Sequence, residues 1–231
     1  METDYARLRD EPSGTPSCDS APDFGPDFAA IGDKVHPSNI RRTPQLLALD
    51  AHGRVLNWIS WQDAACLYSR EAIAWTLGEP CIELRGGISR EYGERSTLAL
   101  HPIIASRGHV RAKGWDPTPN LTNTALFARD LQLCMYCGEH KPRGQLTRDH
   151  VHPVSKGGLD IWENVVAACI HCNSRKGNRT PAQAHMPLLA IPYRPSWVEH
   201  LILSNRNILA DQMEFLKAQL PKDARLRNLR V

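Results

Sequence analysis

The sequence predicts an α+β fold, in which two cysteine pairs enclose a hairpin and a long helix follows near the C-terminus. Short aliphatic and β-branched runs around Gly-containing turns occur in the first half of the chain, and they are typical of hairpins. The two C-x-x-C pairs enclose 31 residues, which is too long for a simple finger loop and indicates a folded insert. Apolar residues at helical spacing run from Ser196 to Leu220, directly before Pro221.

Residues 1–42 are predicted to form a disordered acidic arm. They are rich in Pro, Gly, Ser and Asp and contain few large aliphatic side chains, so they bury too little apolar surface to offset chain entropy. Residues 1–35 carry eight acids and three bases, a net charge of −5, and the rest of the 231-residue chain therefore carries +8. A cationic body suits a polyanionic partner, although an ordinary solvated basic surface has the same composition.

Residues 43–123 are predicted to form an N-terminal α+β region. Two apolar runs around a glycine turn predict a β-hairpin over 46–58, and Ser60 is placed as the N-cap of a helix that reaches Ser69. Beyond this helix we expect two strands, over 72–77 and 97–105, with a loop over 85–96 between them. A linker is expected over 108–123.

Residues 124–190 are predicted to form the domain that carries the chemistry, and residues 191–231 a C-terminal helix with a basic tail. A short helix is expected over 124–131, leading into the first cysteine pair. A second begins at Pro181, because proline suits the first helical position, and Pro187 ends it early. The long helix is expected to span 196–220 without a break.

The two cysteine pairs, Cys134 with Cys137 and Cys169 with Cys172, have the spacing of a tetrahedral zinc site. Four thiolates leave no position for water, so the predicted zinc is structural. The alternative is four reduced cysteines in a core, and a thioredoxin-like redox role is disfavoured because no βαβ pattern surrounds either pair. The other three cysteines, which have no partner at metal spacing, are Cys18, Cys66 and Cys81.

Oxygen ligands, an imidazole and several cations lie within and just after this cysteine clamp. Asp149, His150 and Asn164 lie between the pairs, and Asn173 follows Cys172 directly. Carboxylate and amide oxygens are ligands that magnesium prefers, and histidine titrates near neutral pH. This combination indicates metal-assisted attack on a phosphodiester.

The same residues resemble a known family motif. Asp-His, an Asn fourteen residues after the His, and then C-x-x-C-N-x-x-K-G resemble the HNH endonuclease motif, a ββα-metal fold with an accessory four-cysteine zinc site. The third motif letter is Asn173, so this is an H-N-N version. The segments VLNWISWQDAACLYSREAIAW and TPAQAHMPLL are similar to flanks of stand-alone bacterial HNH proteins.

The resemblance implies a role for each motif residue. His150 is implied as the general base, and Asp149 and Asn173 as ligands of a catalytic Mg²⁺ or Mn²⁺. Asn164 is implied to hold the backbone near His150. Because neighbouring side chains of a strand point to opposite faces, Asp149 and His150 are expected at an irregular strand end. The expected phosphate contacts, for which a solvated basic face is the alternative, are Arg175, Lys176 and Arg179.

The function that these residues predict is metal-dependent hydrolysis of DNA phosphodiester bonds. The alternatives are an RNA-directed nuclease and a catalytically inactive zinc-knuckle protein that binds nucleic acid.

No apolar run reaches the roughly 18 to 20 residues of a membrane span, so no membrane partner is expected. The first residues, METDYARLRDEPSG, have no apolar core, so we expect no secretory signal and a reducing cytoplasmic location. The sequence leaves the oligomeric state open.

Overall fold

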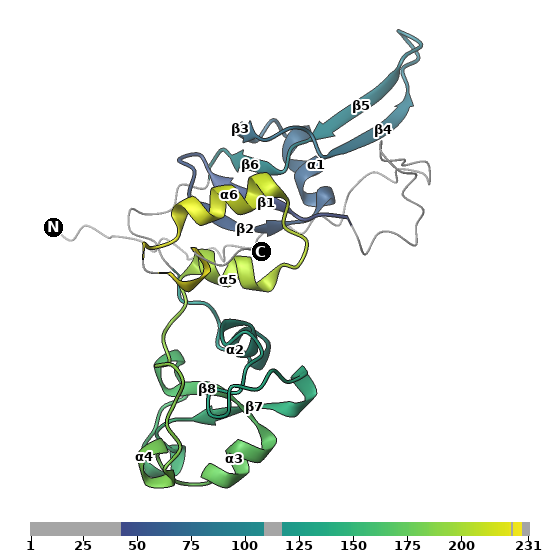
Figure 1. Cartoon of the computed structure of the whole chain (residues 1–231). Helices are drawn as coiled ribbons and strands as arrows, with labels where there is room; N and C mark the ends of the chain where they lie inside the picture. The colour runs from purple at the N-terminus through teal and green to yellow at the C-terminus, as the bar shows by residue number, and fades with distance from the viewer. Residues whose placement is uncertain (1–42, 109–116, 223, 228–231) are drawn as a thin grey trace, which may run out of the picture.

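The computed structural model describes residues 43–108, 117–222 and 224–227. The predicted acidic arm over 1–42 and part of the predicted linker lie outside the described residues. Within them the chain forms two bodies joined by extended segments, one built on a four-stranded sheet and one on a two-stranded ribbon (Figure 1). The predicted α+β class is confirmed.

The larger body is organised around β1 (Leu46–Asp50), which lies inside a sheet of order β2-β1-β6-β3. β1 pairs antiparallel with β2 (Val55–Ile59) and parallel with β6 (Ile103–Ser106), and β6 pairs antiparallel with β3 (Ile73–Leu77). All five residues of β1 are buried, and the first four are apolar, as expected for a strand inside a covered sheet.

The first hairpin and the first helix agree with the sequence prediction. α1 (Trp61–Ser69) begins after Ser60, whose hydroxyl accepts a hydrogen bond from the backbone N–H of Asp63, and the side chain of Asp63 bonds back to Ser60. This capping box starts the helix at the predicted position. Leu46 then packs with α1 on one face of the sheet, while Leu47 and Leu49 face the opposite side.

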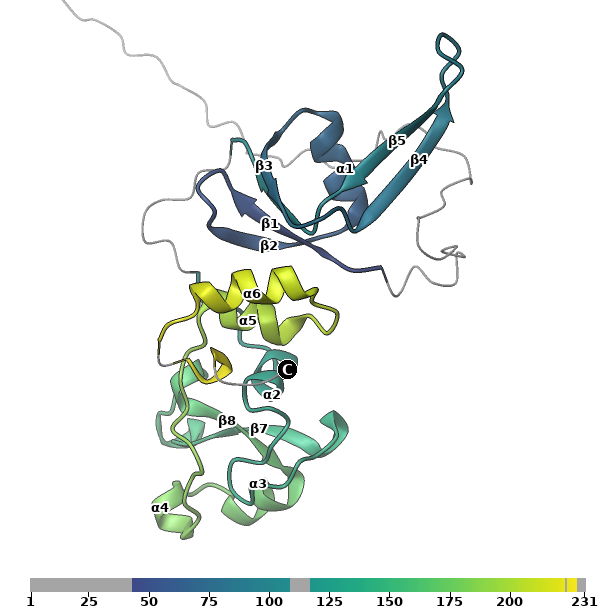
Figure 2. The same cartoon turned by 45° about the horizontal axis from the view of Figure 1, so that its top comes forward.

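The predicted loop over 85–96 is too long, because residues 85–88 and 95–96 belong to the strands of a ribbon and only 89–94 form the turn between them. β4 (Ile82–Ile88) and β5 (Arg95–Leu100) pair antiparallel and project away from the body (Figure 2). The predicted single strand over 97–105 is also wrong. The chain leaves β5 at Leu100, and β6 begins at Ile103 after Pro102, which has no N–H to continue a ladder.

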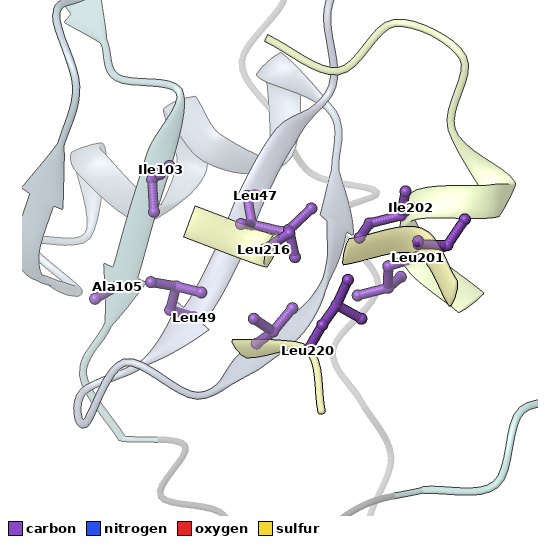
Figure 3. Packing of buried hydrophobic residues seen from close by; sticks show 10 residues of the cluster. Leu47, Leu49, Ile103, Ala105, Leu201, Ile202, Leu216 and Leu220 are labelled. Atoms are coloured by element: carbon purple, nitrogen blue, oxygen red, sulfur yellow. The ribbon is translucent and has the colours of Figure 1, made fainter. Parts of the chain in front are cut away.

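The predicted continuous helix over 196–220 is wrong as well. It consists of α5 (Trp197–Ser204) and α6 (Ala210–Gln219), separated by an extended segment from Asn205. The break lets both helices turn apolar faces toward the sheet, where Leu201 and Leu216 pack with Leu47 (Figure 3). A single straight helix of this length would carry one of these faces past the edge of the small sheet.

Hydrogen bonds fix both C-terminal helices to the N-terminal sheet. The indole nitrogens of Trp58 and Trp197 donate to the carbonyls of Leu201 and Leu56, at 3.0 and 2.8 Å. Gln212 in α6 is fully buried, and its amide donates to the carbonyls of Gln45 and Pro102 at 2.9 and 2.8 Å. The C-terminal helices therefore share a core with residues that precede the cysteine clamp. The proposed domain boundaries remain predictions.

The smaller body contains the cysteine clamp. β7 (Leu146–His150) and β8 (Val165–Cys169) form an antiparallel ribbon, with α2 (Asn123–Arg129) on one side and α3 (Ile170–Lys176) on the other (Figure 1). Residues of α2 pack with Leu146, Val165 and Ala167, whereas Ala168 packs on the other side with the cysteines. α4 (Pro181–Ala184) starts at the predicted proline and ends before Pro187.

A buried ion pair joins the smaller body to the chain that leaves it. Arg129 is 2% exposed, and its guanidinium donates to both carboxylate oxygens of Asp130, at 2.8 and 3.0 Å. The same group donates to the carbonyls of Trp162, Val165 and Tyr193 and lies over the rings of Trp162 and Tyr193. All five guanidinium N–H groups are thereby satisfied.

Replacing Arg129 with alanine is expected to destabilise the protein by about 3 to 5 kcal/mol, because Asp130 would be left as an unpaired buried charge. The midpoint of urea unfolding, followed by far-UV circular dichroism, measures this loss. Arg143→Ala is a matched control, since Arg143 is exposed, and a change within about 0.5 kcal/mol is expected there. Equal midpoints for the two variants would contradict the structural role of Arg129.

Candidate functional site

Four cysteine sulfurs form the metal cluster that the spacing predicts. The Sγ atoms of Cys134, Cys137, Cys169 and Cys172 all lie within 4.8 Å of one another. The first pair lies on a tight turn that ends at Gly138, whose φ of 75° favours glycine. The second pair lies where β8 passes into α3, and the Sγ of Cys169 accepts a hydrogen bond from the N–H of Cys172 at 3.4 Å.

The cluster fits a structural zinc. Zinc–thiolate bonds of about 2.3 Å in a tetrahedron place sulfurs roughly 3.8 Å apart, which is compatible with the observed grouping. Burial opposes ionisation of Cys134, but backbone hydrogen bonds, the largest from Cys137, lower its pKa to about 7. Burial raises the pKa of Cys172, and the neighbouring sulfurs raise it further. Because adjacent thiolates repel each other, a bound cation is needed to hold all four as ligands.

Asp149 is enclosed by α3 and by the turn that carries Cys134 and Cys137, called the zinc loop below. It is 5% exposed, and its Oδ2 accepts a hydrogen bond of 2.5 Å from the hydroxyl of Tyr136, which lies between Cys134 and Cys137 in the sequence. Burial and this hydrogen bond raise the pKa of Tyr136 above its usual range, so the phenol stays protonated and donates. The cysteine loop thus positions one of the two donors that hold the Asp149 carboxylate.

Lys176 provides the second donor, and its prediction as a phosphate contact needs correction. Its side chain is 1% exposed, and its ammonium donates to Oδ1 of Asp149 at 2.9 Å and to the carbonyl of His150 at 2.8 Å. A buried ammonium with these partners does not reach a phosphate in this arrangement. The Lys176 side chain instead closes α3 against the end of β7.

The expected irregular strand end is not observed. β7 keeps regular pairing with β8 through His150, which lies opposite Val165. Thr147 and Asp149 face α3, where the amide of Asn173 donates to the hydroxyl of Thr147 at 2.9 Å. Arg148 and His150 alternate to the other face of the strand. The side chains of Asp149 and His150 therefore diverge, and Asn173 bonds Thr147 rather than Asp149.

His150 is paired with an acid that the sequence prediction missed. Its Nε2 lies 2.9 Å from Oδ1 of Asp160, and Nη1 of Arg148 donates to Oδ2 of the same carboxylate at 2.6 Å. Burial acts to raise the pKa of Asp160, but the hydrogen bonds and charges of Arg148 and His150 outweigh it and lower that pKa. The His150 side chain is 24% exposed, so solvent reaches it.

Asn164 holds the loop that connects β7 to β8. Its Oδ1 accepts from the N–H of His152 at 2.9 Å, and its Nδ2 donates to the carbonyls of His152 and Leu159 at 3.1 and 2.7 Å. The loop is tight at Gly158, where a Cβ would collide with the carbonyl of His152. Asn164 therefore fixes the backbone just after His150.

Arg175 and Arg179, the two remaining predicted phosphate contacts, are exposed. Arg175 lies in the last turn of α3, and Arg179 lies just beyond it. That helix begins at Ile170, so Asn173 lies within it. Arg179 donates to the carbonyls of Lys176 and Arg175, at 3.1 and 2.5 Å, and so caps the C-terminal end of the helix. His171 is also exposed and lines an open cavity of about 700 Å³ beside the zinc loop.

Two residues of the site, Tyr136 and Asp160, could hardly be predicted from the sequence. Tyr136 is the third residue of a C-x-Y-C segment, where a bulky polar residue beside metal ligands is the only hint. Asp160 follows His150 by ten residues across a glycine-containing loop, so local spacing does not predict their contact. Arg148 donates to Asp160 and also to the carbonyl of Leu121, so it links the loop to the segment before α2.

A two-stranded ribbon with a helix on each side and a four-cysteine cluster defines a small ββα metal domain. Residues 134–189 match the family model described as HNH endonuclease. No curated protein matches the chain significantly. Among the described residues, no helix has the length and apolar character needed to span a membrane.

Proposed function

We propose that this protein is a metal-dependent endonuclease that hydrolyses DNA phosphodiester bonds. The observation that carries the proposal is the HNH family match over 134–189. All four predicted catalytic residues, His150, Asp149, Asn164 and Asn173, lie inside that segment at the motif spacing. The family relation implies a hydrolysis that leaves a 5′-phosphate and a 3′-hydroxyl end.

In this proposal His150 takes a proton from water. Histidine is a common general base, and a positioned base contributes roughly 100-fold to 10,000-fold. Asn164 holds the loop after His150 and so keeps the backbone of the base in place. Arg175 and Arg179 are exposed next to α3 and are the proposed contacts to phosphate oxygens.

Asp149 and Asn173 are the proposed ligands of the catalytic Mg²⁺ or Mn²⁺. Their oxygens are of the kind these cations bind, and both side chains lie on the α3 side of β7. An ionised carboxylate has about four acceptor positions, so the bonds from Tyr136 and Lys176 leave Asp149 capacity for a further ligand. A bound cation would neutralise charge that develops on the phosphate. A cation can bind Asp149 in this way only if the buried ammonium of Lys176 moves away from the carboxylate.

A second candidate function is a zinc-knuckle protein that binds nucleic acid without cutting it. The observation that favours it is the buried pair of Lys176 and Asp149, which neutralises the carboxylate that a catalytic cation would use. The divergence of Asp149 and His150 on opposite strand faces points the same way. The location in a reducing compartment such as the cytoplasm is part of both proposals, because only reduced thiols bind zinc.

Incubation of the purified protein with supercoiled plasmid is the direct test. Nicked or linear plasmid is expected with added Mg²⁺ or Mn²⁺, and intact plasmid after chelation of loosely bound cations. Elemental analysis must show that the chelated sample keeps its zinc, so that loss of cutting is not loss of folding. A parallel incubation with RNA addresses the alternative substrate. Binding of DNA without cutting under either cation would favour the second candidate.

A further inference from the structure

The Asp160 carboxylate is held from two sides by residues of β7. Nη1 of Arg148 donates to Oδ2 at 2.6 Å, and Nε2 of His150 lies 2.9 Å from Oδ1. Arg148 is itself held at two further points, because its Nε donates to Oδ1 of Asn123 at 3.0 Å and its Nη2 to the carbonyl of Leu121 at 3.2 Å. Asp160 is therefore fixed to the strand and to the start of α2, although its side chain is 52% exposed.

Hydrogen-bond chemistry decides which nitrogen of His150 carries the proton. An ionised carboxylate only accepts hydrogen bonds, so a nitrogen at 2.9 Å from it must be the donor. In the neutral ring the other nitrogen is then the acceptor. With Nε2–H directed at Asp160, the lone pair lies on Nδ1.

We propose that Asp160 is the positioning residue of the proposed reaction: it holds the proton of His150 on Nε2 and presents Nδ1 as the base. This inference rests on the proposed nuclease function. Nδ1 takes a proton from the attacking water as the water oxygen bonds to phosphorus. The bond from phosphorus to the 3′ oxygen breaks, and that oxygen takes a proton from solvent. The imidazolium that forms lies against the Asp160 carboxylate, which stabilises its charge.

The substitution Asp160→Asn separates this role from a simple clamp on the loop. Arg148 carries only donors, so it takes the single amide oxygen of the new side chain and leaves the NH₂ group facing His150. Nε2 must then accept, and the ring proton moves to Nδ1. The shape of the loop is preserved while the tautomer is reversed.

The test measures both the tautomer and the reaction in the full-length, zinc-loaded protein. Long-range ¹H–¹⁵N spectra, taken above the titration range of histidine and without divalent cation, report which ring nitrogen of His150 is protonated. The His150→Ala spectrum assigns the signal. The wild type is expected to carry the proton on Nε2 and Asp160→Asn on Nδ1. Plasmid cleavage by Asp160→Asn is expected to fall about 100-fold in kcat with KM little changed.

Two further variants complete the experiment. Asp160→Glu keeps an ionised acceptor, so it should retain the wild-type tautomer and recover part of the rate. Glu163→Gln removes an exposed acid three residues away and is expected to leave both measurements unchanged. Each variant is first shown to hold one zinc per chain, so that a folding defect is not mistaken for a catalytic one.

Several results would overturn the inference. An unchanged tautomer in Asp160→Asn would show that Asp160 does not set it, whatever the rate. A reversed tautomer with full activity would show that the reaction does not use Nδ1. If the wild type cuts no plasmid, the nuclease proposal fails and the catalytic role of Asp160 falls with it, while the ring spectra still decide whether Asp160 orients His150.

Discussion

Replacing Cys169 with serine is expected to abolish zinc binding and unfold the smaller body. Structural zinc contributes on the order of 10 kcal/mol to small domains, which is as much as the whole stability of a typical domain. Cys169 ends β8, accepts a hydrogen bond at the start of α3 and belongs to the buried cluster with Cys134 and Ala168. Elemental analysis for zinc and amide hydrogen exchange across residues 134–189 measure the loss.

The four-stranded sheet should survive this substitution, because its two buried clusters contain none of the four cysteines. Protection of β1 amides is therefore the internal reference. Cys81→Ser is the matched control, since Cys81 is not in the sulfur cluster and serine keeps a donor toward the carbonyl of Leu100. Well under one zinc per folded wild-type chain, or a Cys169→Ser protein with native protection over 134–189, would contradict the structural role of the metal.

Patterns confined to neighbouring residues were predicted well. The spacing of the two cysteine pairs predicted the sulfur cluster, and Ser60 with Asp63 predicted the start of α1. These signals depend on contacts between residues a few positions apart, or on ligand types that one ion requires. The HNH motif likewise combined several fixed spacings, and the family match confirms it.

Features set by long-range packing were missed. The break between α5 and α6 depends on the position of the sheet that receives Leu201 and Leu216, which no local pattern reports. The ribbon of β4 and β5 contains Gly86 and Gly87, residues that disfavour strands, yet pairing with β5 overrides that preference.

The site was predicted as a set of residues but not as an arrangement. The burial of Lys176 against Asp149 depends on how closely α3 approaches β7, so its charge alone suggested a phosphate contact. An irregular strand end was expected to bring Asp149 and His150 together, but regular strand alternation places them on opposite faces. The partners that this divergence gives them, Tyr136 and Asp160, come from loops 13 and 10 residues away, where no regular spacing predicts a contact.

These contacts join the two metal chemistries of the proposal. Tyr136 lies between two zinc ligands and donates to Asp149, so the geometry of the sulfur cluster is transmitted to the carboxylate by one side chain. Lys176 ends the helix that begins next to Cys169 and meets the same carboxylate from the other side. Loss of zinc would therefore disturb the Asp149 site even before the domain unfolded.

His150→Ala and Asp149→Asn are expected to impair cleavage in different ways. His150→Ala removes the proposed proton acceptor but leaves Asp149 and Asn173, so cation affinity should persist while cleavage falls by about two to four orders of magnitude. Asp149→Asn removes the only anionic ligand in the proposed cation site. It keeps one oxygen to accept from Lys176, and its NH₂ group then faces the Tyr136 hydroxyl, which can accept. Its cleavage should therefore require more Mg²⁺ and recover in part at high concentration. Plasmid cleavage measured against Mg²⁺ concentration separates the two behaviours.

The two variants must be compared as folded proteins, because Asp149→Asn also leaves the ammonium of Lys176 buried without a counter-charge. Removing one partner of a buried pair costs about 3 to 5 kcal/mol, so thermal unfolding of both variants sets the temperature of the assay. Zinc content and DNA binding should be unchanged in both, since the sulfur cluster and the exposed Arg175 are not altered. Near wild-type cleavage by His150→Ala would exclude it as the base. An unchanged Mg²⁺ dependence in Asp149→Asn would instead mean that Lys176 remains the partner of residue 149 during the reaction and that the cation binds elsewhere.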